Sequence, residues 1–142
     1  VIERVKPFHT NKKKELVKRP KIYFIDTGLR NMVAGNFPDK ATGELFENYV
    51  YTELLKQGLE PKYWRTKSQS EVDFIINEIP VEVKQNYDEE SIPSGLRSFI
   101  ETYQPEEAYI LHMQGEQNTL EHENCKVKHR NLDQLKQGLN TN

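Results

Sequence analysis

Short apolar runs alternate with polar turns along the chain, a pattern that predicts several strands and a few helices rather than a helical bundle. The predicted strands lie at residues 1–9, 15–26, 62–65, 71–76, 79–84, 108–112 and 126–130. The predicted helices lie at residues 27–33, 41–56, 93–103 and 132–139, and residues 114–124 are predicted to form a polar loop. Helices interspersed with strands favour an α/β domain built around a mixed sheet.

The most informative pattern is a predicted β-hairpin at residues 71–84. Its two-residue turn is Asn77-Glu78, which sets a register in which paired positions sum to 155. Because side chains alternate along a strand, this register predicts one apolar face, formed by Val72, Phe74, Ile76, Ile79, Val81 and Val83. On the other face, Glu71 would oppose Lys84 and Asp73 would oppose Glu82.

Two carboxylates placed directly across a ladder repel each other, so Asp73 or Glu82 is expected to have a raised pKa, and the pair is expected to lie beside a positive group. Lys84 is two residues beyond Glu82 and shares its predicted face. An alternative interpretation is a half-solvated face whose charges point to water. Ile75 and Pro80, predicted on the same face, favour the functional interpretation because that face is not wholly polar.

The helix at 41–56 places one carboxylate on its apolar side. Leu45, Phe46, Tyr49, Val50 and Leu54 form a broad apolar arc, and Asn48 and Thr52 lie opposite it. Glu47 falls inside the apolar side, where an unpaired charge would be expensive to bury. Glu53 lies on the apolar flank as well, so the pattern favours Glu47 without excluding Glu53.

Charge is distributed unevenly although the net charge is only −2. Residues 1–21 carry a net charge of +6, and the remainder carries −8. The basic segment, above all Lys12, Lys13 and Lys14, could contact nucleic-acid phosphates, or it could be a solvated loop. Arg65 and Lys67, just before the hairpin, are further candidates for phosphate contact.

The remaining composition restricts the class of protein. The single cysteine, Cys125, excludes an internal disulfide and favours a reducing, cytoplasmic setting, with a structural role for the thiol. There is no apolar run of the roughly 20 residues that span a bilayer, so no membrane association is expected. The histidines have no metal-ligand spacing, and no Ser/His/Asp or Cys/His arrangement emerges.

The acidic residues together suit a hard divalent cation, Mg²⁺ or Mn²⁺, which prefers a few carboxylates and water. Asp73 and Glu82 would bind the metal, Glu47 would complete the site, and the backbone carbonyl of Val83 is a further candidate ligand. In phosphodiester hydrolysis, such a metal polarises the phosphate and lowers the pKa of the attacking water. Lys84 would stabilise charge on the phosphate or orient the water.

Glu47 in a helix, followed by Asp73 and by Glu82-Val83-Lys84 after a tight hairpin, resembles the PD-(D/E)XK nuclease superfamily. The segments that begin at Lys21, Gly43, Tyr63, Glu71 and Val81 also resemble the uncharacterised C-terminal domain of many bacterial and archaeal AAA-type ATPases. Val72, rather than proline, precedes Asp73, which departs from the superfamily pattern. The resemblance implies a three-layer restriction-endonuclease-like fold.

The resemblance also implies a domain organisation and a function. Residues 1–21 would be a basic β-ribbon or linker from a preceding domain, and residues 22–142 the nuclease-like domain. An ATPase module would precede this chain in a longer protein, an expectation that the valine at position 1 favours. The expected function is metal-dependent endonucleolytic cleavage of DNA, a hydrolase activity. The alternative is an inactive nuclease-fold module that binds DNA or a protein partner for the ATPase. The net negative charge of the residues after 21 favours this alternative. The presence of all four candidate site residues, Glu47, Asp73, Glu82 and Lys84, favours the enzyme.

Overall fold

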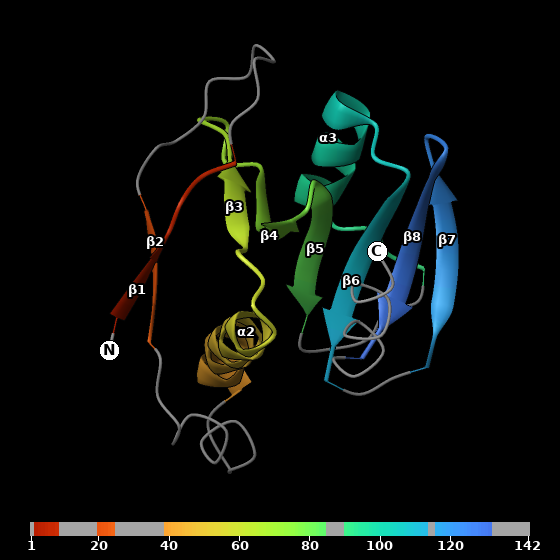
Figure 1. Ribbon diagram of the computed structural model, residues 1–142. Coiled ribbons are helices and arrows are strands. Elements are labelled where there is room, and N and C mark those ends of the chain that lie inside the picture. Colours follow the sequence, from red (N-terminus) through yellow and green to blue (C-terminus); the bar gives the residue numbers. More distant parts are fainter. Residues whose placement is uncertain (1, 9–19, 25–38, 85–89, 114–115, 132–142) are drawn as a thin grey trace.

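The computed structural model describes residues 2–8, 20–24, 39–84, 90–113 and 116–131 (Figure 1). Its helices are α2 (Asp39–Lys56) and α3 (Ser94–Tyr103). Its strands are β1 (Ile2–Val5), β2 (Lys21–Phe24), β3 (Lys62–Arg65), β4 (Glu71–Ile76), β5 (Ile79–Lys84), β6 (Glu107–His112), β7 (Asn118–His122) and β8 (Cys125–Arg130). The helices predicted at 27–33 and 132–139 lie outside the described residues. Neither described helix is long and apolar enough to cross a membrane.

Six strands form one mixed sheet in the order β3-β4-β5-β6-β8-β7. β5 pairs in parallel with β6, and β6 in parallel with β8, whereas the other neighbours are antiparallel. The parallel β5–β6 pair requires a crossover, and α3 lies in that connection. The prediction of an α/β domain with a mixed sheet is therefore confirmed.

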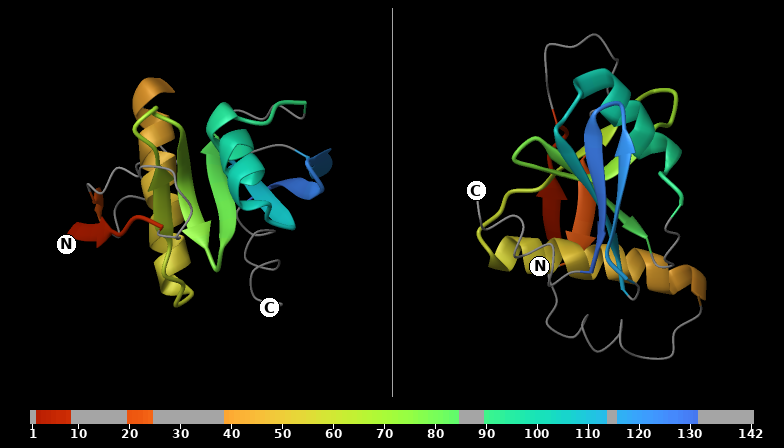
Figure 2. Two further views of the ribbon diagram at one scale, coloured as in Figure 1. Left: turned by 90° about the horizontal axis from the view of Figure 1, so that it is seen from above. Right: turned by 90° about the vertical axis from the view of Figure 1, so that its right-hand side faces the viewer.

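Each helix covers one face of the sheet, and alternation along β6 separates the two cores. Tyr109 and Leu111 pack in a cluster with α2, while Ala108 and Ile110 pack in a second cluster with α3. From above, the β4–β5 hairpin lies between the two helices (Figure 2). The second cluster also holds Trp64, whose indole N–H donates to the Tyr103 hydroxyl over 3.2 Å.

The antiparallel ribbon β1–β2 lies beside β3, and the residues that follow β1 are hydrogen-bonded to that strand (Figure 1). The Phe8 amide donates to the Tyr63 carbonyl over 2.7 Å, and the Tyr63 amide donates to the Lys6 carbonyl over 3.2 Å. Tyr23 of β2 stacks on Tyr51 of α2, with ring centroids 4.4 Å apart. The ribbon therefore packs against both the sheet and α2.

One sequence prediction about an individual element is wrong. Residues 118–122, predicted as part of a loop, form the edge strand β7, which pairs with β8 through a tight turn at Glu123 and Asn124. Both turn residues have positive φ, 49° and 64°, which suits a two-residue hairpin although neither is glycine. Asn48 and Thr52 of α2, which lie opposite the apolar arc, are buried as well. The covered part of this helix is therefore wider than its apolar arc.

The β4–β5 hairpin has the predicted turn and register. Asn77 and Glu78 adopt positive φ values of 49° and 69°, and the paired positions include Phe74 with Val81 and Ile76 with Ile79. Such a turn matches the natural twist of the two strands, so the register near the turn is well determined.

A β-bulge in β4 changes the predicted faces. The pairing of β3 with β4 shifts by one residue between the pairs Trp64–Val72 and Lys62–Ile75. Val72 and Ile75 therefore pack in the α3 cluster, whereas Phe74 packs in the α2 cluster. The prediction that Val72 and Phe74 share a face, with Ile75 beside Asp73, is wrong because an extra residue in one strand reverses the alternation.

The first turn of α3 packs tightly against the start of β4 at Gly95. A Cβ atom added at Gly95 would lie 1.9 Å from the backbone oxygen of Glu71. No side-chain rotation relieves a contact with backbone, so Gly95→Ala should force the helix and the strand apart.

We expect Gly95→Ala to lower the free energy of unfolding by about 3 kcal/mol, measured by urea denaturation. Gly58→Ala is the matched control, because Gly58 has a φ of 74° and no atom within 4 Å of an added Cβ. It should cost only about 1 kcal/mol, the usual penalty for a left-handed alanine. Equal losses in the two variants would contradict the close approach at Gly95.

Candidate functional site

Asp73 and Glu82 lie where β4 and β5 separate. Backbone pairing of the two strands extends from the turn to Phe74 and Val81. Beyond that point the Asp73 amide donates to Glu82 Oε2 over 3.2 Å, and the Val83 amide donates to Asp73 Oδ2 over 2.9 Å. The two carboxylates thus accept hydrogen bonds from the opposite strand, where carbonyl groups would accept in a continuous ladder.

Burial of these carboxylates changes their titration. Both residues are only 8% exposed. Burial and the neighbouring Glu47 carboxylate raise the pKa of Asp73 to about 6, although Lys21 opposes the shift. Burial and the charge of Asp73 raise the pKa of Glu82 well above its ordinary value. The expected repulsion between the two carboxylates raises the pKa of Glu82, whereas the carboxylates that raise the pKa of Asp73 are Glu47 and Glu71; burial is the larger cause for both groups.

The ammonium group of Lys21 lies among three carboxylates. Its nitrogen is 2.7 Å from Glu47 Oε1, 2.7 Å from Glu71 Oε1 and 3.5 Å from Asp73 Oδ1. The Lys21 side chain is only 16% exposed. Burial alone would lower its pKa, but Asp73 and Glu47 raise that pKa above its ordinary value, so Lys21 remains charged. We call Lys21, Glu47, Glu71 and Asp73 the Lys21 cluster.

The helix contributes Glu47, as the periodicity favoured. The Tyr23 hydroxyl donates to Glu47 Oε1, which also accepts from Lys21. Burial and the charge of Glu47 raise the pKa of Tyr23, so this phenol keeps its proton and remains a donor. Glu53, the alternative carboxylate, instead pairs with Lys56 one turn away, at 3.0 Å.

The Glu82-Val83-Lys84 segment carries the other candidate groups. Lys84 Nζ lies 3.7 Å from Glu82 Oε1, and its side chain is 47% exposed, so it is accessible from solvent. The Val83 amide is occupied by Asp73, as described above. Lys84 is therefore the accessible cation at this end of the site, whereas Lys21 is the buried one.

The carboxylates of this site are the kind of ligand that a divalent cation prefers. In this structure, however, they are not arranged around a metal position. Carboxylate oxygens from α2 and β4 converge on a single positive centre, as Mg²⁺ would require. That centre is the Lys21 ammonium. Over the part of the chain that the structure describes, no three His, Cys, Asp or Glu side chains are arranged to hold a metal ion.

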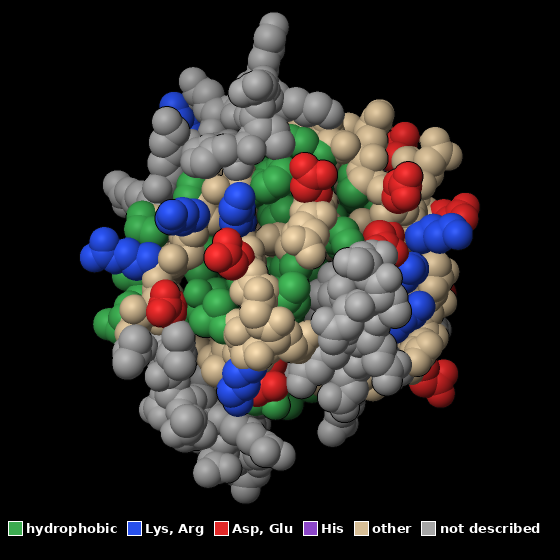
Figure 3. All heavy atoms as spheres, in the orientation of Figure 1, with side chains coloured by type: hydrophobic (Ala, Val, Ile, Leu, Met, Phe, Trp, Pro, Cys, Tyr) green, Lys and Arg blue, Asp and Glu red, His purple; other side chains and the backbone are tan. Residues whose placement is uncertain are grey.

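The candidate phosphate-binding residues have different surroundings. Arg65 forms a forked pair with Glu71, Nε to Oε2 and Nη2 to Oε1, both at 3.1 Å. Lys67 is exposed in the turn between β3 and β4. Lys12, Lys13 and Lys14 lie outside the described residues. On the face shown in Figure 3, basic and acidic side chains are interspersed over the described elements.

Three members of the site were missed from the sequence: Lys21, Tyr23 and Glu71. Lys21 was counted only within the basic segment, and Glu71 was expected opposite Lys84. A signal existed, because Lys21 and Tyr23 are two residues apart on a strand and therefore share a face. The sequence pattern does not reveal that this face packs on α2.

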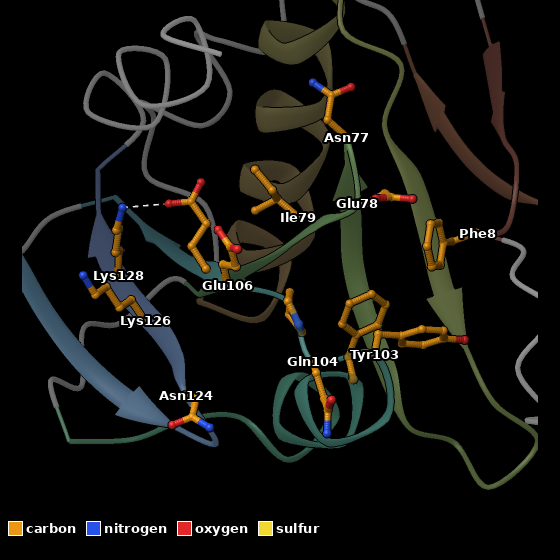
Figure 4. A pocket seen from close by; sticks show the side chains of 13 residues that line it. Phe8, Asn77, Glu78, Ile79, Tyr103, Gln104, Glu106, Asn124, Lys126 and Lys128 are labelled. Atoms are coloured by element: carbon orange, nitrogen blue, oxygen red, sulfur yellow. Dashed lines mark hydrogen bonds and ion pairs between the residues drawn. The ribbon is translucent and has the colours of Figure 1, made fainter.

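Two other features lie apart from the Lys21 cluster. A pocket of about 930 Å³ is lined by Phe8, Tyr103 and Lys126, among others, and by the Lys128–Glu107 ion pair at 2.8 Å (Figure 4). Cys125 is buried in the α3 core, and burial together with Glu107 raises its thiol pKa to about 11. Such a thiol is a poor nucleophile, which agrees with a structural role.

Two family models match the chain, each over a different segment. Residues 42–130 match the family described as a domain of unknown function, DUF4143, and residues 1–40 match a second such family, DUF8612. No curated protein and no solved structure matches the chain. DUF4143 domains are often found in proteins associated with AAA-type ATPases. Since the first match spans more than half of the sequence, the chain belongs to the DUF4143 family.

Proposed function

We propose that this domain is a metal-dependent deoxyribonuclease of the PD-(D/E)XK type, acting together with an AAA-type ATPase. The observation that carries the proposal is the opened end of the β4–β5 hairpin. There, Asp73 and Glu82 are each held by an amide of the opposite strand, with Lys84 two residues further on. This arrangement keeps two carboxylates close together at the cost of burial and repulsion, which favours a role that requires them.

In this proposal Mg²⁺ or Mn²⁺, when bound, polarises the scissile phosphate and lowers the pKa of the attacking water. Asp73 and Glu82 would hold the cation, with Glu47 completing the set. The amides of Asp73 and Val83 fix the two carboxylates, and Tyr23 fixes Glu47. Lys84, half exposed beside Glu82, would contact the phosphate and stabilise its developing charge.

DNA would approach from the side of the β3–β4 turn. Lys67 is exposed on that turn, and the Arg65 side chain is held in place by its forked pair with Glu71. Lys12, Lys13 and Lys14 would add sequence-independent attraction to phosphates. Neutralising these three lysines should weaken DNA binding and reduce its salt dependence without altering the chemistry.

The direct test is a cleavage assay with linear, branched and single-stranded DNA. Each substrate would be offered with Mg²⁺, with Mn²⁺ and with a chelator, to this chain alone and together with an AAA-type ATPase module. Cleavage that requires the cation would support the proposal. Absence of cleavage under every condition, with DNA binding retained, would instead support the alternative below.

The second candidate is a nuclease-fold module without catalysis, which binds DNA or a protein for the ATPase. One observation favours it: Lys21 already neutralises Glu47 and Asp73, two of the three carboxylates proposed to hold the cation. A site permanently closed by an internal ion pair would stabilise the domain and leave binding to its surface. The two candidates differ in whether the Lys21 ammonium can leave.

A further inference from the structure

The Lys21 cluster is assembled from both matched segments of the chain. Lys21 and Tyr23 belong to the segment at residues 1–40, whereas Glu47, Glu71 and Asp73 belong to the DUF4143 match at 42–130. The ribbon holds its position through buried Val5 and Tyr23, which pack in the α2 core. The position of Lys21 is therefore fixed by packing between the two segments, and Lys21 is not a freely moving surface side chain.

The distances within the cluster are unequal. Lys21 lies 2.7 Å from Glu47 and from Glu71 but 3.5 Å from Asp73. Glu71 is also neutralised by Arg65, whereas Glu47 and Asp73 are two of the three carboxylates that the proposed function assigns to the cation. Two positive centres cannot share these oxygens at close range without strong repulsion.

We propose that Lys21 determines what this site binds: its ammonium occupies the cation position, and a divalent cation enters only when Lys21 releases Glu47 and Asp73. This inference rests on the proposed function, because it takes the carboxylates to be a cation site. Glu71 is the partner that Lys21 keeps after release, since their contact is short and Glu71 is not among the proposed ligands. The residues at 1–40 thereby control access to a site in the DUF4143 domain.

The test is Mn²⁺ binding, measured by calorimetry at pH 7.5, in wild type and in Lys21→Met. Methionine keeps an unbranched apolar chain but removes the charge, so Mn²⁺ should bind at least ~10-fold more tightly to the variant. Lys21→Arg restores a positive charge and should return the affinity toward that of wild type. Lys56→Met is the matched control, because Lys56 pairs only with Glu53 in the described contacts and lies on α2.

Equal or weaker Mn²⁺ binding by Lys21→Met would overturn the inference, and so would absence of binding in both proteins. Tighter binding without DNA cleavage by any variant would leave the inference standing while the proposed function fails. The two failures are therefore distinguishable.

A second measurement needs no variant and covers the case in which Lys21→Met does not fold. An amine-reactive reagent should label Lys21 slowly in the metal-free wild-type protein, because its side chain is 16% exposed and holds three carboxylates. Saturating Mn²⁺ should accelerate labelling of Lys21 severalfold while leaving exposed Lys62 unchanged. Labelling of Lys21 that does not respond to Mn²⁺ would contradict the release.

Discussion

Replacing Asp73 with asparagine is expected to abolish metal-dependent DNA cleavage, with a loss on the order of 10³-fold or more, because a ligated metal contributes several kcal/mol of transition-state stabilisation. Asparagine can still accept the hydrogen bond from the Val83 amide, so the hairpin should keep its shape. DNA affinity should stay unchanged or rise slightly, since a negative charge near phosphate is removed. The measurements are single-turnover cleavage and DNA binding on the same substrate.

Lys84→Met and Glu53→Gln complete this experiment. Lys84→Met should also abolish cleavage but should weaken DNA binding modestly, because it removes a half-exposed positive charge. Glu53→Gln is the control on α2, since Glu53 pairs with Lys56 outside the site. Full cleavage by Asp73→Asn would show that Asp73 has no part in the chemistry.

The stability of the wild-type domain is expected to fall as the pH rises from about 4 to about 7. The pKa of Asp73 is about 6 in the folded protein and 3.8 in an unfolded chain, so the folded state holds this proton more tightly. The stabilisation is complete below the unfolded value and is lost as the pH rises through the folded value. With 1.36 kcal/mol for each pKa unit, the change amounts to about 3 kcal/mol.

Glu82 and Glu71 also affect how the stability of the domain depends on pH. Glu82 also has a raised pKa and acts in the same direction as Asp73. The pKa of Glu71 is lowered, although burial opposes the shift, because Arg65 and Lys21 bind its charged form. The stability that Glu71 contributes is present above its ordinary pKa of 4.5 and is lost at lower pH, at the lower end of the range in which Asp73 titrates.

Urea unfolding of wild type and Asp73→Asn between pH 4.5 and 7.5 measures this effect. The variant should gain stability relative to wild type as the pH rises, because it has no charge to bury. Glu116→Gln, at an exposed position, should run parallel to wild type. Parallel profiles for wild type and Asp73→Asn would contradict the raised pKa of Asp73.

The parts of the fold that depend on local chemistry could be predicted from the sequence. The turn at Asn77-Glu78 fixes the register of the hairpin next to it, and Gly58 ends α2 because its φ of 74° suits glycine. The short strand β7 was missed because its turn contains Glu123 and Asn124 rather than glycine. The bulge in β4 was missed because it is set by pairing with β3, which lies outside the hairpin pattern.

The candidate site shows the same division. Glu47 was found because it interrupts the apolar side of its helix, and Asp73 and Glu82 were found because the hairpin register places two carboxylates opposite each other. Lys21 was missed because its role depends on the position of the ribbon, which brings residue 21 to residues 47, 71 and 73. Charge counting placed Lys21 with the basic segment, although it is neutralised by carboxylates of the body.

The central claim is that Asp73, Glu82 and Glu47 form a cation site at which Lys21 now lies, and anomalous diffraction from crystals soaked in Mn²⁺ tests it most directly. We expect an anomalous peak within ligand distance of Asp73 and Glu82, with the Lys21 ammonium withdrawn to Glu71. Crystals of Lys21→Met should show the same peak at a lower Mn²⁺ concentration. Absence of a peak from both crystals, with Lys21 of the wild type still bonded to Glu47 and Asp73, would contradict the claim.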